Sequence, residues 1–107
     1  MFRLISLAIA LVSMCGSALA DKIDGAWCNE AGARVDIDGP KISLSGKPAF
    51  DGQYARHEFL YTVPPGEDHA GVQIYMRLQD EEDMTSFTMK DGKGVDPVAW
   101  KRCAQTS

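Results

Sequence analysis

The chain has 107 residues, with 11 Lys or Arg against 15 Asp or Glu, which gives a net charge of −4. This acidic surplus argues against binding to nucleic acid or to an anionic membrane surface, because phosphate groups need a concentrated basic face. The charge is compatible with a basic protein partner, although modest acidity is also ordinary for solubility.

The first twenty residues have the pattern of a cleaved secretory signal peptide. Arg3 provides a positive start, residues 4–14 form an apolar run, and Ala-Leu-Ala at 18–20 fits a small-x-small cleavage site. The apolar run is too short to span a bilayer comfortably and no charged stop-transfer flank follows, so we expect no membrane span after cleavage. Met14 precedes Cys15 where a lipoprotein signal has a small residue, so we expect no lipid anchor. The sequence predicts a periplasmic or secreted protein.

Cleavage after Ala20 leaves residues 21–107, a stretch of 87 residues that suffices for a single small domain. Arg3 leaves with the signal, so 10 basic side chains remain against 15 acidic ones and the net charge becomes −5. Two cysteines remain, Cys28 and Cys103, and they lie near the two ends of the domain. Cysteines in a small exported domain are expected to pair, and neither of these has a second ligand at metal-site spacing. We therefore predict a Cys28–Cys103 disulfide.

The first half of this domain has strand patterns and no helix pattern. Residues 23–28 are a short apolar opening that contains Trp27. Residues 33–38 and 41–45 alternate apolar and polar side chains on either side of an Asp-Gly-Pro break, which predicts a hairpin. Residues 46–52 contain Pro48 and an Asp-Gly pair, and we predict that they are irregular.

The longest strand patterns lie in Gln53–Gln79, which contains both histidines and all three tyrosines. Residues 53–63 and 71–79 are predicted strands, and the loop between them contains a Pro-Pro-Gly sequence. Matching the apolar faces of the two strands favours one register. Its pairs are Val63 with Val72, Phe59 with Met76, and Glu58 with Arg77. In this register His57 points toward the apolar face.

The remaining chain predicts a charged turn at 80–83, a strand at 84–90, a turn at 91–94 and a last strand at 98–103. About seven short strands without a long connection indicate an all-β fold with an antiparallel meander. Such a sheet must cover its apolar face, and a disulfide that joins the first and last strands favours closure. We therefore predict a closed or nearly closed barrel, with a β-sandwich as the alternative.

Two short segments resemble lipocalin-like barrels. Gly25-x-Trp27 is similar to the Gly-x-Trp that begins the first strand of those barrels, and Lys101-Arg102 resembles the basic residue that packs over that tryptophan. The chain is much shorter than a typical lipocalin. The resemblance implies a barrel and implies nothing about ligand carriage.

Candidate binding residues fall on the long strands, in the loop between them, in the charged turn and near the end of the chain. They are His57, Tyr61, Arg77, Glu67, Asp68, His69, Asp80, Glu81, Glu82, Asp83 and Trp100. A histidine facing the apolar side is either a neutral core residue or lines a pocket with Tyr61 that binds a polar ligand. Trp100 packs in the core or, if exposed beside the basic pair, anchors a partner.

Neither acidic segment has the pattern of a metal site, so we predict no metal and no cofactor. Glu67, Asp68 and His69 follow one another directly on a loop, where successive ligands rarely converge on one ion, and a solvated loop tip is the simpler interpretation. The turn at 80–83 lacks the alternating acidic ligands and the glycine of an EF-hand loop. It is either a solvated turn or an acidic contact surface for a basic protein.

No nucleophile motif such as G-x-S-x-G occurs in the sequence, so we predict a non-enzymatic binding module of the cell envelope. The concrete version of this hypothesis is an inhibitor of a basic secreted hydrolase, contacted through the acidic turn or the loop after Val63. One alternative is a lipocalin-like barrel that binds a small ligand near His57 and Tyr61. Another alternative is an enzyme that uses His57. The oligomeric state stays open.

Overall fold

The structure is a computed structural model and describes residues 22–104. Over these residues the chain forms nine antiparallel strands of a single sheet and no helix. The strands are β1 (Gly25–Cys28), β2 (Arg34–Asp38), β3 (Lys41–Leu44), β4 (Phe50–Asp51), β5 (Gln53–Ala55), β6 (Glu58–Thr62), β7 (Gln73–Asp80), β8 (Asp83–Lys90) and β9 (Lys93–Arg102). The all-β prediction is confirmed. The predicted signal peptide at 1–20 lies outside the described residues.

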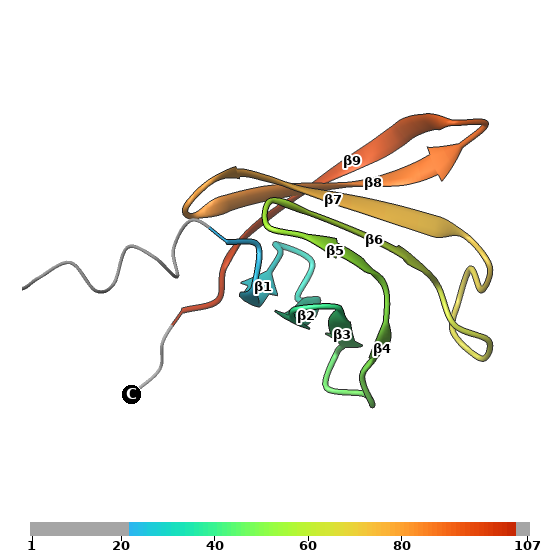
Figure 1. The fold of residues 1–107 in the computed structure, drawn as a ribbon, viewed down its shortest axis with the longest axis horizontal. Helices are drawn as coiled ribbons and strands as arrows, with labels where there is room; N and C mark the ends of the chain where they lie inside the picture. Colours follow the sequence, from blue (N-terminus) through green and yellow to red (C-terminus); the bar gives the residue numbers. More distant parts are fainter. Residues whose placement is uncertain (1–21, 105–107) are drawn as a thin grey trace, which may run out of the picture.

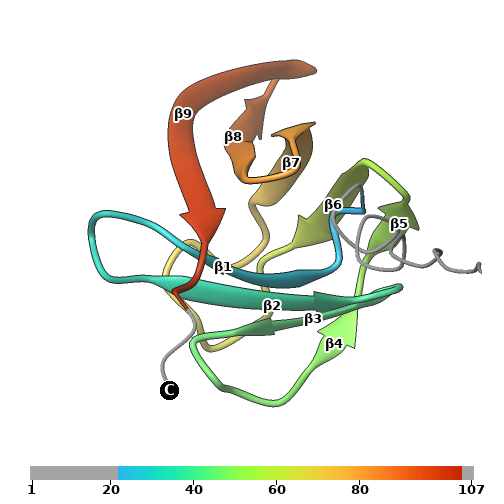
Figure 2. The same ribbon diagram turned by 90° about the vertical axis from the view of Figure 1, so that its left-hand side faces the viewer.

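The strands follow one another in the order β4-β3-β2-β1-β9-β8-β7-β6-β5, and the sheet curls into a cup (Figures 1 and 2). A two-sheet sandwich is therefore not formed by the described residues. The sheet is not closed, and β4 and β5 are its two ends. Only Gly52 separates these two strands, and one residue is too short to form a hairpin loop that would reverse the chain and pair them.

The strand count differs from the predicted seven for two local reasons. Phe50–Asp51 pairs with β3 inside the segment that was predicted to be irregular. The predicted strand 53–63 is a hairpin, because the chain reverses at Arg56 and His57 and β5 pairs back on β6. The other predicted pairings are confirmed, including the hairpin of β2 with β3 and the register that sets Phe59 opposite Met76 in β6 and β7.

The predicted disulfide is confirmed, and it lies where the two halves of the sheet meet. β1 and β9 are joined by the residue pairs Trp27–Arg102 and Cys28–Lys101, and this junction links the strands before residue 52 to those after it. The Cα atoms of Cys28 and Cys103 are 5.0 Å apart, and the Cys103 N–H donates to the Ala26 carbonyl at 3.0 Å. The covalent bond therefore reinforces a short stretch of ladder.

One end of the cup is closed by the segment that precedes β1. Ile23 and Trp27 are fully buried, and the Trp27 indole N–H donates to the Ile23 carbonyl at 2.8 Å. The Arg102 guanidinium lies 4.0 Å from the centroid of the Trp27 ring and donates to the carbonyls of Asp24 at 2.6 Å and Lys22 at 2.8 Å. The packing of a basic residue over this tryptophan, implied by the lipocalin-like resemblance, is confirmed for Arg102.

Asp24 ties this segment to strands on both sides of the gap in the sheet. Its carboxylate accepts hydrogen bonds from the Tyr54 hydroxyl, in β5, and from the Gly39 N–H at 2.8 Å, in the turn after β2. Burial alone would raise the pKa of Asp24, but these hydrogen bonds outweigh it and hold that pKa below its ordinary value. The same hydrogen bond raises the pKa of Tyr54 to about 12. The Asp24 carboxylate thus connects β5 to the turn after β2 at the closed end.

Candidate functional site

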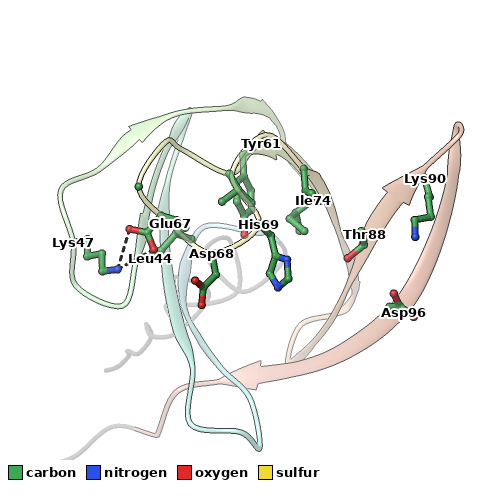
Figure 3. Close-up of a pocket in the computed structure, with 13 residues that line it drawn as sticks. Leu44, Lys47, Tyr61, Glu67, Asp68, His69, Ile74, Thr88, Lys90 and Asp96 are labelled. Carbon is green, nitrogen blue, oxygen red and sulfur yellow. Dashed lines mark hydrogen bonds and ion pairs between the residues drawn. The ribbon is translucent and has the colours of Figure 1, made fainter.

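The other end of the cup is open and holds a cavity of about 670 Å³ under the loop between β6 and β7 (Figure 3). Its walls come from β3, β6, β7, β8 and β9, and its roof comes from residues 66–69 of the loop. Aliphatic and aromatic side chains line the inner part: Leu44, Tyr61, Val63, Val72 and Ile74. Polar and charged side chains complete the lining: Lys47, Glu67, Asp68, His69, Thr88, Lys90 and Asp96.

The loop over the cavity is fixed by its own backbone and by one ion pair. The N–H of Val63 donates to the Val72 carbonyl at 2.8 Å, and the Val72 N–H donates to the His69 carbonyl at 3.1 Å. His69 has a φ of 66°, in the left-handed region, which lets the chain turn back toward β7. Lys47, after β3, pairs with Glu67 at 2.8 Å. The loop is therefore attached to both sides of the cavity.

Tyr61 is the aromatic residue of the cavity lining. It is only 8% exposed, and Figure 3 shows its side chain directed from β6 toward the inside of the cup. Its ring packs edge-on to Phe50 at 5.7 Å and against Phe59 at 6.3 Å between centroids, so its orientation is fixed. Within residues 22–104, no hydrogen bond is made by the Tyr61 hydroxyl. Burial raises the pKa of this phenol to about 12, so it remains an O–H donor at neutral pH.

The charged residues of the lining lie at the rim rather than beside Tyr61. Figure 3 shows the Lys47–Glu67 pair on one side of the cavity and Lys90 with Asp96 on the other. Among the described residues, Asp68, Lys90 and Asp96 take part in no ion pair. The rim therefore presents charges of both signs around an apolar interior.

Four of the predicted binding residues meet at this cavity, namely Tyr61, Glu67, Asp68 and His69. His57 does not, and the prediction that it faces the apolar side is wrong. It lies exposed in the two-residue turn between β5 and β6, where its carbonyl accepts the Leu78 N–H at 2.9 Å. His57 belongs to the turn and not to β6, so the alternation of inward and outward side chains in β6 does not apply to it.

Arg77 lies exposed on the outer face, opposite Glu58 as the predicted register requires. The hydroxyl of Tyr75 connects the two, because it donates to Glu58 at 2.7 Å and accepts from Arg77 at 3.2 Å. This outer-face group is separated from the cavity by the sheet. Arg77, His57 and Tyr61 therefore do not form one site.

The acidic turn at 80–83 is partly engaged by its own neighbours. The Asp80 carboxylate accepts the N–H groups of Glu82 and Asp83, both at 3.0 Å. Asp83 pairs with Lys101, whose hydrogen bond holds the Asp83 pKa below its ordinary value. Arg102 Nε donates to the Glu81 carbonyl at 2.9 Å. The Lys101 ammonium thus offsets the charge of Asp83, one of the four carboxylates of the turn.

Trp100 is a core residue. It is 7% exposed, and its indole N–H donates to the Ser86 hydroxyl at 2.9 Å. The alternative of an exposed Trp100 that anchors a partner is therefore wrong. The indole N–H is therefore satisfied within the core and is not free for a ligand.

The cavity also has lining residues that sequence analysis missed, and β8 carried a signal for them. Ser86, Thr88 and Lys90 lie on the inward face of this strand, and Thr88 is opposite Ile74. The side chains of a strand that face the core are normally apolar. The alternate polar residues that follow Met84 on this face therefore indicate where the apolar core ends.

Within the described part of the chain, no three His, Cys, Asp or Glu side chains are grouped so that they could hold a metal ion. That part also has no helix of the length and apolarity needed to cross a membrane. No protein-family model, curated protein or solved structure matches the chain.

Proposed function

We propose that this protein is an exported, non-enzymatic binding protein that holds a small ligand in the cavity at the open end of the cup. The observation that carries the proposal is the hydroxyl of the buried residue Tyr61, which is directed into the cavity and has no hydrogen-bond partner among residues 22–104. This hydroxyl can therefore donate to a bound molecule that offers an acceptor.

The size and lining of the cavity support a small ligand. Its volume of about 670 Å³ lies within the range of roughly 300–1,000 Å³ that is common for ligand sites. Ligand sites combine apolar walls with polar groups that fix orientation. Here the five apolar or aromatic side chains are joined by seven polar or charged ones, and Tyr61 supplies a hydroxyl among the apolar group. The sheet acts as an incomplete barrel whose closed end is filled by Ile23 and Trp27 and whose open end admits the ligand.

The other hypotheses receive less support from the contacts. An inhibitor of a basic hydrolase would use the acidic turn, yet Asp80 and Asp83 are already bonded within the molecule. An enzyme based on His57 would need that residue at the cavity, and it lies in a turn outside the lining. The disulfide fits an oxidising compartment, so we place the protein in the periplasm or outside the cell.

The proposal is tested by fluorescence titration of the exported, disulfide-bonded protein with N-phenyl-1-naphthylamine, a neutral apolar probe. Thr88→Trp should block binding, because Thr88 lies in the cavity wall and a tryptophan there fills the space. Thr85→Trp is the matched control, since Thr85 lies on the outer face of the same strand, opposite Arg77.

The expected result is saturable binding to the wild type and to Thr85→Trp, with at least a tenfold loss of affinity in Thr88→Trp. Absence of saturable binding to the wild type, or equal binding to both tryptophan variants, would show that the cavity is not a ligand site. Circular dichroism spectra of the three proteins check that the strands are retained.

A further inference from the structure

The hydrogen-bonding chemistry of Tyr61 restricts the class of ligand, given the proposed function. We propose that the cavity binds a neutral, mainly apolar molecule that carries an oxygen acceptor, and that the Tyr61 hydroxyl donates a hydrogen bond to this oxygen. A carbonyl or ether oxygen would serve. A ligand that offers only a donor could bond the phenol oxygen, but it would leave the phenol proton without an acceptor in the ligand.

The donor is held ready for such a ligand before binding. Phe50 and Phe59 pack on the Tyr61 ring, so little side-chain entropy is lost when the hydroxyl engages an oxygen. The phenol also keeps its proton well above neutral pH, because burial raises its pKa to about 12. The phenol oxygen is therefore held in a fixed position and keeps its proton across the physiological range.

The surroundings of the hydroxyl favour a neutral ligand. The inner lining beside Tyr61 is aliphatic, with Val63, Val72 and Ile74, and the charged side chains lie at the rim. The rim has carboxylates as well as ammonium groups, so an ionised ligand would meet like charges as well as opposite ones there. An ionised group also loses more hydration than a neutral oxygen when it moves next to aliphatic side chains, and a neutral oxygen still accepts the hydrogen bond.

Two probes of the same shape distinguish the hydrogen bond to Tyr61 from apolar binding in the cavity. The probes are 2-acetylnaphthalene, which has a carbonyl oxygen, and 2-isopropenylnaphthalene, which has a CH₂ group in its place. Affinities are measured by displacement of N-phenyl-1-naphthylamine from the disulfide-bonded protein. One net hydrogen bond predicts that the wild type binds the ketone about fivefold more tightly than the hydrocarbon.

Tyr61→Phe should bring this ratio to about one and leave the affinity for the hydrocarbon almost unchanged. Tyr75→Phe is the matched control, because Tyr75 lies on the outer face and its hydroxyl contacts Glu58 and Arg77. It should keep the wild-type ratio. A second measurement needs no variant: the infrared carbonyl stretch of the bound ketone should lie at lower frequency than that of the ketone in an apolar solvent.

Each outcome decides between the two proposals. If both probes bind the wild type equally, or if Tyr61→Phe keeps the fivefold preference, the hydrogen-bond inference fails while cavity binding stands. If 2-naphthoate binds more tightly than the ketone, the preference for a neutral ligand is overturned. If no probe binds the wild type, the proposed function itself fails.

Discussion

Replacement of Arg102 by Met should lower the free energy of unfolding by about 3 kcal/mol. The guanidinium donates to three carbonyls, at 2.6 Å to Asp24, 2.8 Å to Lys22 and 2.9 Å to Glu81. It also lies 4.0 Å from the Trp27 ring centroid. The carbonyls are near the surface and can be rehydrated, so we assign about 0.7 kcal/mol to each bond and about 1 kcal/mol to the cation–π contact.

The measurement is urea unfolding followed by tryptophan fluorescence, with the disulfide intact. Methionine keeps an unbranched apolar stem and removes the guanidinium, so the loss reports mainly the contacts of the guanidinium. Arg102→Lys keeps the charge but lacks the planar fork, and we expect it to recover less than half of the loss. A domain of this size should lose roughly 4–8 °C of melting temperature per kcal/mol.

Lys101→Met is the matched control for this prediction. Lys101 precedes Arg102 in β9, and its side chain is 72% exposed where it pairs with Asp83. Exposed pairs contribute little, so the unfolding midpoint should move far less than in Arg102→Met. If the two variants unfold at the same urea concentration, the guanidinium does not hold the closed end, and the assigned contacts are energetically unimportant.

Three further predictions concern stability. Replacing both Cys28 and Cys103 by Ser should cost about 4 kcal/mol in urea unfolding, because a loop with a sequence separation of 75 is released; a loss under about 1 kcal/mol would contradict the entropic account. Gly52→Ala would place a Cβ 2.3 Å from the Phe59 ring, so we expect a loss of stability of about 1–3 kcal/mol. Calorimetry should show this loss as a lower melting temperature, and an unchanged melting temperature would mean that the ring moves aside without cost. The free energy of unfolding should fall as pH rises from about 10 to about 12, because folded Tyr61 and Tyr54 both keep a proton that the unfolded chain loses near pH 10. Tyr61→Phe should remove its own contribution and make the fall shallower, and a pH profile identical to that of the wild type would refute the assignment for Tyr61.

Pairings between neighbouring strands could be predicted from the sequence because alternation fixes the register. Val35 and Ile37 lie on one face of β2, and a shift of one residue would expose both, so alternation restricts the pairing with β3 to registers that keep them buried. The short turn between β2 and β3 then selects one of these registers. The same argument gave the register of β6 and β7. The disulfide followed from the cysteine count and the expected compartment, without any knowledge of strand order.

The hairpin of β5 and β6 could not be predicted in the same way. Its turn consists of Arg56 and His57, and neither is a glycine, proline, asparagine or aspartate that marks a reversal. A two-residue turn also places Tyr54 and Phe59 opposite each other and so on the same face, whereas a continuous strand would place them on opposite faces. A prediction that continues the alternation of β6 through residues 53–55 therefore assigns each of those side chains to the wrong face.

The cavity depends on the order of the strands in space, which short-range patterns do not contain. Leu44 of β3, Ile74 of β7 and Asp96 of β9 become neighbours only because the sheet curls, and they are distant in the sequence. Phe87 of β8 lies on the outer face, where its ring stacks on Tyr75 with 6.3 Å between centroids. Because Phe87 is apolar, a prediction based on hydrophobicity assigns its face to the core and does not detect that the opposite, polar face points inward.

The contacts that stabilise the fold and the cavity proposed to bind a ligand lie at opposite ends of the cup. Arg102, the Cys28–Cys103 bond and Asp24 all act at the closed end, where they hold the N-terminal segment and the junction of β1 with β9. A small domain buries too little apolar area to leave space unfilled without such reinforcement. Contacts concentrated at one end allow the other to keep a cavity whose Tyr61 hydroxyl has no hydrogen-bond partner among residues 22–104. It follows that Arg102→Met, although less stable, should keep the wild-type ratio of ketone to hydrocarbon affinity wherever it remains folded.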